Sequence, residues 1–191
     1  MKTTYLSLLF CFFLVSGFSQ DQKKAIVENF IENFNKKDST AVFEVLHKNF
    51  AEYWQKLVVN EDKKDYSKYY SWAKEMQENE EIEIVSVKGN KVVVNSTYYS
   101  DLDRLLGKLP YKCKKTFVLS NNGKIIKIIN DKHKSYDYYQ NKRKSSYISF
   151  KNWLRSTHGL KRQDFSLTLE DAKKMKSILL EYISEVDVAK L

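Results

Sequence analysis

The chain has 191 residues and a formal net charge of +9 at pH 7, from 33 lysine and arginine residues against 24 aspartate and glutamate residues. This length suits one domain with a sizeable hydrophobic core. Nearly all of the positive excess is lysine, whereas recognition of phosphates and bases favours the fork geometry of arginine. The composition therefore argues against nucleic acid as a partner and indicates a lysine-rich surface in contact with water.

Residues 1–19 have the pattern of a secretory signal peptide. Lys2 gives a basic start, an apolar run extends over residues 5–15, and small residues follow up to Ser19. The apolar run is too short to span a bilayer as a permanent helix. We therefore expect cleavage near Ser19, export to the periplasm or out of the cell, and a mature chain without a stable membrane anchor.

The chain contains 2 cysteines, Cys11 and Cys113. Phe10 stands where the processing of a lipoprotein requires a small residue, so we expect Cys11 to leave with the signal peptide. The mature chain then keeps Cys113 alone and can form no intrachain disulfide. Because Cys113 shares a strand face with Phe117, we interpret it as a buried thiol.

Helical patterns precede the predicted sheet. Residues 21–34 place apolar side chains three and four positions apart, which predicts an amphipathic helix. Asp38 is well placed to cap a second helix, whose apolar stripe extends as far as Trp54. A short extended segment at residues 57–59 follows, and Asp65 is the expected cap of a third helix that is rich in aromatic residues.

The stretch from Glu81 to His133 has the pattern of an antiparallel sheet. Its runs of β-branched and aromatic residues cover 82–87, 91–99, 113–119 and 124–130. Gly89-Asn90 and Asn121-Asn122-Gly123 suit tight hairpins between neighbouring runs. We therefore predict two hairpins joined by a longer connection.

The last of these runs is apolar on both faces. Strand alternation predicts Ile125 and Ile129 on one face and Ile126 and Ile128 on the other. Both faces near the final hairpin must then be covered, either by more of the same chain or by a second copy. This pattern is the basis for expecting a homodimer that forms through the sheet.

Two further helices are expected after His133. The first carries aromatic residues on one face and ends at Gly159, and the second begins near Thr168 and Asp171, a pair typical of a helix N-terminus. No repeat, low-complexity tract or linker divides the chain. We predict an α+β domain at residues 20–140 after the signal peptide, and a C-terminal helical extension at residues 141–191.

The order of these elements resembles that of the nuclear transport factor 2-like superfamily, which includes the SnoaL-like polyketide cyclases. The resemblance is carried by NFIENFNKKDSTAVFEVLHKNFAEYW, GNKVVVNSTYY and NGKIIKIINDKHKSYDYYQ. It implies a cone-shaped fold in which a curved antiparallel sheet is wrapped by the N-terminal helices, with the two C-terminal helices added. It implies no reaction, because this fold hosts isomerases, cyclases, dehydratases, hydrolases and binders without chemistry.

The resemblance points to one candidate catalytic pair. SnoaL-like cyclases tend to place an acid late in the last strand, near the position of His133, and here the acid is Asp131. Residues two apart on a strand share a face, so Asp131 could orient His133 as a general base. The alternative is a strand end that becomes polar as it leaves the sheet. We therefore assign no catalytic residue and keep this pair as a candidate.

Other polar residues have structural explanations. Asp38 is interpreted as a helix cap, His47 as packed beside a helical core, and His158 as solvent-facing. The acidic cluster at residues 78–81 is interpreted as a solvated turn. No two histidines have metal-ligand spacing and no cysteine cluster exists, so neither a metal nor another cofactor is expected.

Aromatic residues from the helices and one strand are expected to enclose the mouth of the cone. Such side chains offer flat apolar surface with a polar tip, which suits a ring-containing or apolar ligand. The alternative is that they fill the core or cover a dimer face. The candidate ligand-binding residues are Tyr53, Trp54, Tyr69, Trp72 and Tyr98.

These observations favour an exported, non-catalytic protein that holds a small apolar ligand in a SnoaL-like cone. An alternative from the enzyme class is a lyase or isomerase that acts on a cyclic carbonyl compound with His133 and Asp131. A third hypothesis is an envelope protein-interaction module that uses the sheet and the basic terminal helices.

Overall fold

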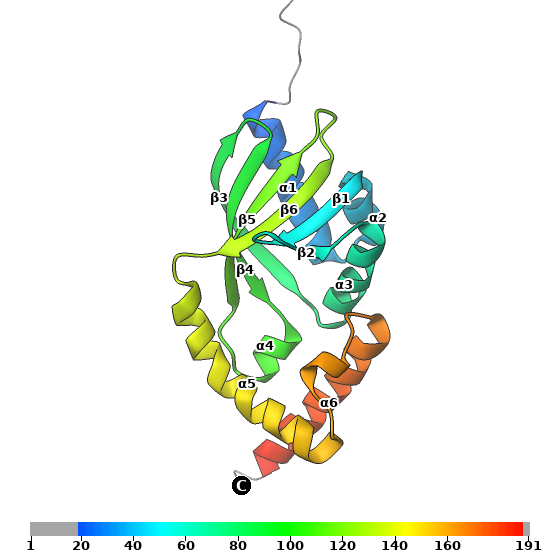
Figure 1. The fold of residues 1–191 in the computed structure, drawn as a ribbon, viewed down its shortest axis with the longest axis vertical. Coiled ribbons are helices and arrows are strands. Elements are labelled where there is room, and N and C mark those ends of the chain that lie inside the picture. The colour runs from blue at the N-terminus through cyan, green and yellow to red at the C-terminus, as the bar shows by residue number, and fades with distance from the viewer. Residues whose placement is uncertain (1–18, 189–191) are drawn as a thin grey trace, which may run out of the picture.

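The computed structural model describes residues 19–188, so the predicted signal peptide lies outside the described residues except for Ser19. Two helices and two strands come first, a third helix leads into a meander of four strands, and a C-terminal helical part follows (Figure 1). In chain order the elements are α1 (Gln20–Lys36), α2 (Ser39–Val45), β1 (Leu46–Trp54), β2 (Leu57–Asn60), α3 (Lys63–Glu75), β3 (Asn79–Lys88), β4 (Lys91–Tyr99), α4 (Asp101–Leu105), β5 (Tyr111–Leu119), β6 (Ile125–Lys132), α5 (Tyr136–His158), a 3-10 helix (Arg162–Asp164) and α6 (Leu169–Val188).

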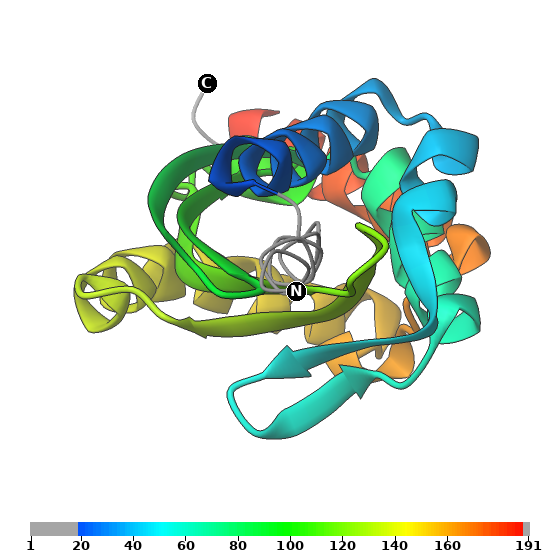
Figure 2. The same ribbon diagram turned by 90° about the horizontal axis from the view of Figure 1, so that it is seen from above.

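The six strands form one curved sheet in the order β2-β1-β6-β5-β4-β3. Seen from above, the strands curl around one side of α1, which lies across the concave face (Figure 2). This confirms the predicted α+β cone and both hairpins, β3–β4 and β5–β6. The sheet is mixed and not wholly antiparallel, because β1 pairs with β6 in the parallel direction.

The predicted second helix is wrong beyond Val45, because residues 46–54 form β1. The helical interpretation rested on Leu46 and Phe50, which are buried and four positions apart. A spacing of four puts two residues on one face of a helix, but also on one face of a strand. Pairing with β6, which is nearly 80 residues away in sequence, decides between the two.

Side-chain caps fix where the first helices begin. Asp38 Oδ1 accepts a hydrogen bond from the Ala41 amide at 3.0 Å, which confirms Asp38 as the cap of α2. The predicted cap of α3 is wrong by three positions: Asp62 Oδ1 accepts from the Asp65 amide at 2.9 Å. Asp65 lies in the first turn and forms an ion pair with Lys68 at 2.8 Å.

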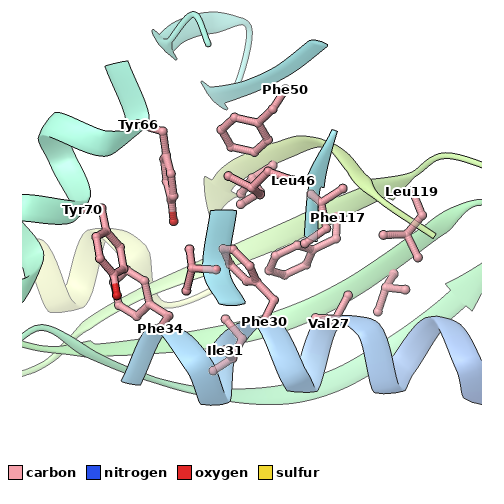
Figure 3. Packing of buried hydrophobic residues seen from close by; sticks show 14 of the residues in the cluster. Val27, Phe30, Ile31, Phe34, Leu46, Phe50, Tyr66, Tyr70, Phe117 and Leu119 are labelled. Atoms are coloured by element: carbon pink, nitrogen blue, oxygen red, sulfur yellow. The ribbon is translucent and has the colours of Figure 1, made fainter. Parts of the chain in front are cut away.

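The main core fills the space between α1, α2, α3 and the concave face of the sheet (Figure 3). The predicted stripe of α1 supplies Phe30 and Phe34, which are 1% and 2% exposed. Phe30 meets Phe117 of β5 edge to face, with the ring centroids 5.8 Å apart. Burial of such rings is the main term that holds the helices on the sheet.

The predicted division of the four isoleucines in β6 is wrong. Ile125 and Ile128 are 0% and 1% exposed and lie together in the main core, whereas Ile126 and Ile129 are half-buried. The ladder between β5 and β6 shifts register between Val118 and Leu119, which adds a residue to β6 and changes which side chains point inward. Cys113 is confirmed as a buried thiol.

A second core joins the C-terminal extension to the cone. It lies between α3, α4, α5 and α6 and contains Trp72, Phe150, Phe165, Met175 and Leu179. The two predicted C-terminal helices are confirmed, and α5 ends at Gly159 in the left-handed conformation as expected. These helices lie at one end of the sheet, beside α4 (Figure 1).

Candidate functional site

A pocket of about 220 Å³ opens at the end of the cone that faces α4 and α5. The α3–β3 connection, the end of β4, the start of α4, the start of β5 and the first half of α5 meet there. The lining residues are Tyr69, Glu78, Tyr98, Tyr99, Ser100, Leu102, Asp103, Tyr111 and Arg143. Four of these nine residues are tyrosines, and acidic and basic side chains stand among them.

Glu78 is the most chemically distinctive group in this pocket. It follows α3 directly, and its Oε2 accepts a hydrogen bond from the Tyr69 hydroxyl at 2.8 Å. Burial raises the pKa of Glu78 to about 7, with the Tyr69 hydrogen bond and Lys37 opposing the shift. A carboxyl group with this pKa can donate or accept a proton near neutral pH.

The opposite side of the pocket is held by an ion-pair cluster. Asp103 Oδ1 accepts from Arg143 Nη2 at 2.7 Å and lies 3.1 Å from Lys108 Nζ. The Arg143 guanidinium also lies over the Tyr111 ring, 5.5 Å from its centroid. Since Arg143 belongs to α5, the C-terminal extension supplies part of the pocket wall and fixes its shape.

Polar groups continue inward from the pocket into the cone. Lys115 Nζ lies 2.7 Å from Glu80 Oε1 and also donates to the Tyr98 hydroxyl. Ser96 Oγ donates to Glu80 Oε1 at 2.6 Å. The charges of this network are therefore paired by neighbours within the cone, and Tyr98 links it to the pocket wall.

A second carboxylate lies deeper in the cone. Glu52 of β1 accepts hydrogen bonds from Asn60 Nδ2 at 2.6 Å and Asn130 Nδ2 at 2.8 Å. Burial raises the pKa of Glu52, and the nearby Lys115 opposes that shift. Its hydrogen bonds tie the edge hairpin β1–β2 to β6.

The sequence analysis missed the acids and the lysine of this site. The interpretation of residues 78–81 as a solvated turn is wrong, because Glu80 is 2% exposed and Glu78 is half-buried. One signal was present: Lys115 lies between Cys113 and Phe117 in the strand alternation, at an inward position. A lysine at such a position requires a buried acid as partner.

The predicted ligand-binding aromatics do not all reach one place. Tyr69 and Tyr98 line the pocket together. Trp54 lies behind the wall, with its ring centroid 6.5 Å from that of Tyr111. Trp72 is part of the second core, and Tyr53 lies under the ammonium of Lys127.

The structure does not bring Asp131 and His133 together. Asp131 Oδ1 accepts from Gln55 Nε2 at 3.0 Å on the exposed surface, and His133 Nδ1 is 2.7 Å from Ser135 Oγ. Partial burial lowers the pKa of His133, and the charges of Lys134 and Lys112 lower it further. Neither residue lines the tyrosine-walled pocket.

The other two histidines lie away from the pocket, and His47 is half-buried on a strand instead of beside a helical core as predicted. His47 lies on β1, where its Nδ1 accepts a hydrogen bond from the Asn49 amide at 3.1 Å. The expectation that His158 faces solvent is wrong, because its ring packs on Trp153 with the centroids 5.1 Å apart. Its Nε2 lies 3.3 Å from Glu181 Oε2.

Within residues 19–188, no three histidine, cysteine, aspartate or glutamate residues are grouped so that they could hold a metal ion. Across the same range, no helix combines the length and the apolar character needed to cross a membrane.

No protein-family model matches the chain, and no curated protein matches it. Several solved structures are similar to the chain in fold. SalBIII, described as an epoxide hydrolase/cyclase-like enzyme in pyran ring formation in the polyether salinomycin, aligns with a TM-score of 0.53 at 20% identity, over 62% of this chain and 97% of that one. Bal32a, from a soil-derived mobile gene cassette, aligns with a TM-score of 0.52 at 14% identity, over 65% of this chain and 98% of that one.

Fold and pocket together define an α+β cone protein with a small, tyrosine-walled pocket at its mouth. The fold is the α+β cone that the resemblance to the nuclear transport factor 2-like superfamily implied, and it is shared with SalBIII and Bal32a. Likeness at this level of identity shows the fold and not a reaction.

Proposed function

We propose that the protein binds a small, uncharged organic molecule in the pocket between Glu78 and Arg143. The observation that carries this proposal is the contact between Tyr69 and Glu78, which places a protonatable carboxyl group among tyrosine rings. Pockets that bind small molecules combine apolar walls with a few fixed polar groups. A volume of about 220 Å³ limits the ligand to a small molecule, such as a single substituted ring.

The electrostatics of the pocket favour a ligand with a hydroxyl or carbonyl group. Glu78 has a pKa of about 7, so near neutral pH it can donate to a carbonyl or accept from a hydroxyl. Asp103 is paired with both Arg143 and Lys108, so this cluster has one cation in excess, which favours a ligand that presents an oxygen acceptor. The likeness to the cyclase-like SalBIII supports a small-molecule site in the cone, as a matter of fold only.

Binding of a neutral environment-sensitive dye tests this proposal. 4-(Dimethylamino)benzonitrile, which has a single ring, should gain fluorescence with the purified protein, and small cyclic alcohols or ketones should displace it. Tyr69→Phe keeps the ring and removes the hydroxyl that holds Glu78, so displacement by the cyclic ligands should weaken about tenfold. Tyr138→Phe, on an exposed residue away from the pocket, is the matched control and should behave as wild type.

The proposal is wrong if the dye stays dark and native mass spectrometry finds no retained small molecule. It is also wrong if Tyr138→Phe changes binding as much as Tyr69→Phe does.

A second function is favoured by the pKa of Glu78. We propose that Glu78 serves as a general base on a cyclic carbonyl compound, because a base with a pKa near the working pH transfers protons efficiently. Exchange of the protons beside the carbonyl of cyclohexanone for deuterium, followed by NMR, would detect this activity. Glu78→Gln should abolish the catalysed exchange. If His133→Gln abolishes it instead, the base is His133, as the candidate pair of Asp131 and His133 predicted from the sequence.

We further propose that the protein is exported and that copies pair through the sheet. Export rests on the signal pattern of residues 1–19, and pairing rests on the half-buried Ile126 and Ile129 beside lysines on the outer face. Cell fractionation with an epitope at the C-terminus tests the first, and sedimentation equilibrium tests the second. A monomer at all accessible concentrations would remove the pairing proposal.

A further inference from the structure

A second cavity, of about 340 Å³, adjoins the tyrosine-walled pocket. The two cavities have Tyr99, Ser100 and Asp103 in common, at the end of β4 and the start of α4. The other walls of the second cavity come from the α3–β3 connection, from α4 and from the chain between α4 and β5. The cavities are therefore neighbours, and a ligand with two linked parts would reach both.

Two carboxylate oxygens are open to these cavities. Glu78 Oε2 accepts from the Tyr69 hydroxyl, and Asp103 Oδ1 accepts from Arg143, but the second oxygen of each carboxylate accepts no hydrogen bond from the described residues. Among those residues, only two side-chain polar atoms are both fully enclosed and without a partner, and neither belongs to Glu78 or Asp103. Glu78 Oε1 and Asp103 Oδ2 are therefore not enclosed, and each can accept a hydrogen bond from a ligand.

Tyr99 offers an aromatic face where the two cavities meet. The residue lines both cavities and is 41% exposed. Its hydroxyl donates to Glu81 Oε2 at 3.1 Å, which fixes the direction of the ring. A flat apolar face of this kind packs against the C–H face of a sugar ring.

The second cavity offers hydrogen-bond donors as well as acceptors. Gln77 Nε2 donates to the Lys74 carbonyl at 2.9 Å, which leaves Gln77 Oε1 as an acceptor. Arg104 donates to Asp101 Oδ1 at 3.0 Å through Nη2, and its other N–H groups have no acceptor among the described residues. The Ser100 hydroxyl accepts one hydrogen bond, from a backbone amide of α4, and donates to no described residue. A group with several hydroxyls matches this wall, because each hydroxyl both donates and accepts.

The charges at this junction favour hydroxyl groups over an anion. Two carboxylates, Asp101 and Asp103, are each paired with two cations, which are Arg104, Lys176, Arg143 and Lys108. An anion would gain from the excess of cations but would also meet the open oxygen of Asp103. A hydroxyl gains from both, because it can donate to Asp103 Oδ2 and accept from Arg104.

We infer that the ligand is an uncharged glycoside of a small phenol, with its ring in the tyrosine-walled pocket and its sugar in the second cavity. This inference rests on the proposed function, because the ring occupies the pocket between Glu78 and Arg143. A free hydroxyl on the ring donates to Glu78 Oε1, and a sugar hydroxyl donates to Asp103 Oδ2. The apolar face of the sugar lies on the ring of Tyr99.

Calorimetric titration with two compounds that share one phenol ring tests this inference. 4-Methoxyphenol fills only the pocket, whereas 4-hydroxyphenyl β-D-glucopyranoside carries a sugar in place of the methyl group. The glucoside should bind at least about tenfold more tightly, because the sugar adds hydrogen bonds in the second cavity.

Two substitutions change the second cavity alone, Arg104→Gln and Gln77→Asn. Each should weaken binding of the glucoside about fivefold and leave binding of 4-methoxyphenol unchanged. Asparagine tolerates the left-handed backbone at Gln77, where φ is 50°, so the turn is kept. Arg155→Gln is the matched control, because it removes the same charge from an exposed position on α5 that lines neither cavity, and it should bind both compounds as wild type.

The outcomes separate this inference from the proposed function. Equal affinity for the two compounds would overturn the glycoside and leave the ring site in place, whereas failure of both to bind would overturn the proposed function as well. Unchanged binding of the glucoside by Arg104→Gln and Gln77→Asn, or equal weakening by Arg155→Gln, would place the sugar outside the second cavity and overturn the inference. Tighter binding of the β-D-glucuronide of the same phenol would show that the cations select an anion and would overturn the uncharged class.

Discussion

Lys115 Nζ lies 2.7 Å from Glu80 Oε1 inside the cone, and the two side chains are 3% and 2% exposed. The pair joins neighbouring parts of the sheet, since Glu80 comes from β3 and Lys115 from β5, with Ser96 of β4 between them. A buried ion pair is costly to break, because the remaining charge loses its partner without regaining water.

Lys115→Met should therefore destabilise the protein by about 3 to 5 kcal/mol, because Glu80 is left charged in an apolar interior. Urea unfolding followed by circular dichroism measures the loss. Lys114→Met is the matched control, since Lys114 is exposed on the other face of the same strand, and its effect should stay within about 0.5 kcal/mol.

The double substitution Lys115→Met with Glu80→Gln should recover much of that loss, because it removes both charges. Additive losses in the double-mutant cycle would show that the two charges act independently and would contradict this account.

This pair also shows how far the sequence predicts the site. Alternation in β5 predicts that Lys115 points inward. Its partner Glu80 lies 35 residues earlier, at the start of β3, where the sequence resembles a polar turn. Local patterns predicted α1, the start of α2, α3, the two hairpins and the two C-terminal helices, but not α4. They could not give β1, because the spacing of Leu46 and Phe50 fits both a helix and a strand until β6 is present.

Stability should depend on pH through Glu78. Its pKa in the folded protein is about 7, above the ordinary value of 4.5, so the folded state binds the proton more tightly than the unfolded state. The stability contributed by the protonated group is complete below pH 4.5 and is lost as the pH rises toward 7. Glu52 has a raised pKa and contributes with the same sign.

Glu78→Gln isolates this contribution. The variant mimics the protonated form, so its stability relative to wild type should increase between pH 4.5 and pH 7 by on the order of 1 to 3 kcal/mol. Urea midpoints measured across this range for both proteins give the difference. A difference that does not change with pH would mean that Glu78 titrates near its ordinary pKa.

The two faces of β6 should respond differently to truncation. Ile128 is 1% exposed in the main core, so Ile128→Ala should cost about 2 to 5 kcal/mol of unfolding free energy. Ile126 is half-buried on the outer side, and Ile126→Ala should cost about 1 kcal/mol or less. Equal losses at low protein concentration would contradict the register shift between β5 and β6, whereas a loss for Ile126→Ala that grows with concentration would indicate pairing of copies.

The pocket depends on contacts that are distant in sequence, which is why the sequence did not locate it. Arg143 reaches it from α5 and meets Asp103, 40 residues earlier, and no local pattern links the two. Five aromatic residues were predicted to bind a ligand, and of these five only Tyr69 and Tyr98 line the pocket. Aromatic residues at helical spacing serve a core and a pocket equally well, so their division follows only from tertiary packing.

Cys113 should be chemically inert in the folded protein. The thiol is 0% exposed, and burial raises its pKa to about 11, so very little thiolate forms near neutral pH. Iodoacetamide at pH 8 should modify the mature protein at least about a hundredfold more slowly than the same protein in urea, as followed by intact mass. Rapid modification without urea would show that β5 opens readily.

The N-terminus that the proposed signal-peptide cleavage would leave should affect the stability of α1. Ser19 Oγ accepts from the Gln22 amide at 3.1 Å, and Gln22 Oε1 accepts from the Ser19 amide at 2.8 Å, so Ser19 closes a capping box on the helix. Cleavage after Ser19 would remove this cap and cost about 1 kcal/mol, whereas cleavage before Ser19 would keep it. Intact mass of the exported protein identifies the cut, and chains that begin at Ser19 and at Gln20 should differ in urea midpoint accordingly. Equal midpoints would mean that the first turn of α1 contributes nothing to the packing of Val27 and Phe30 on the sheet.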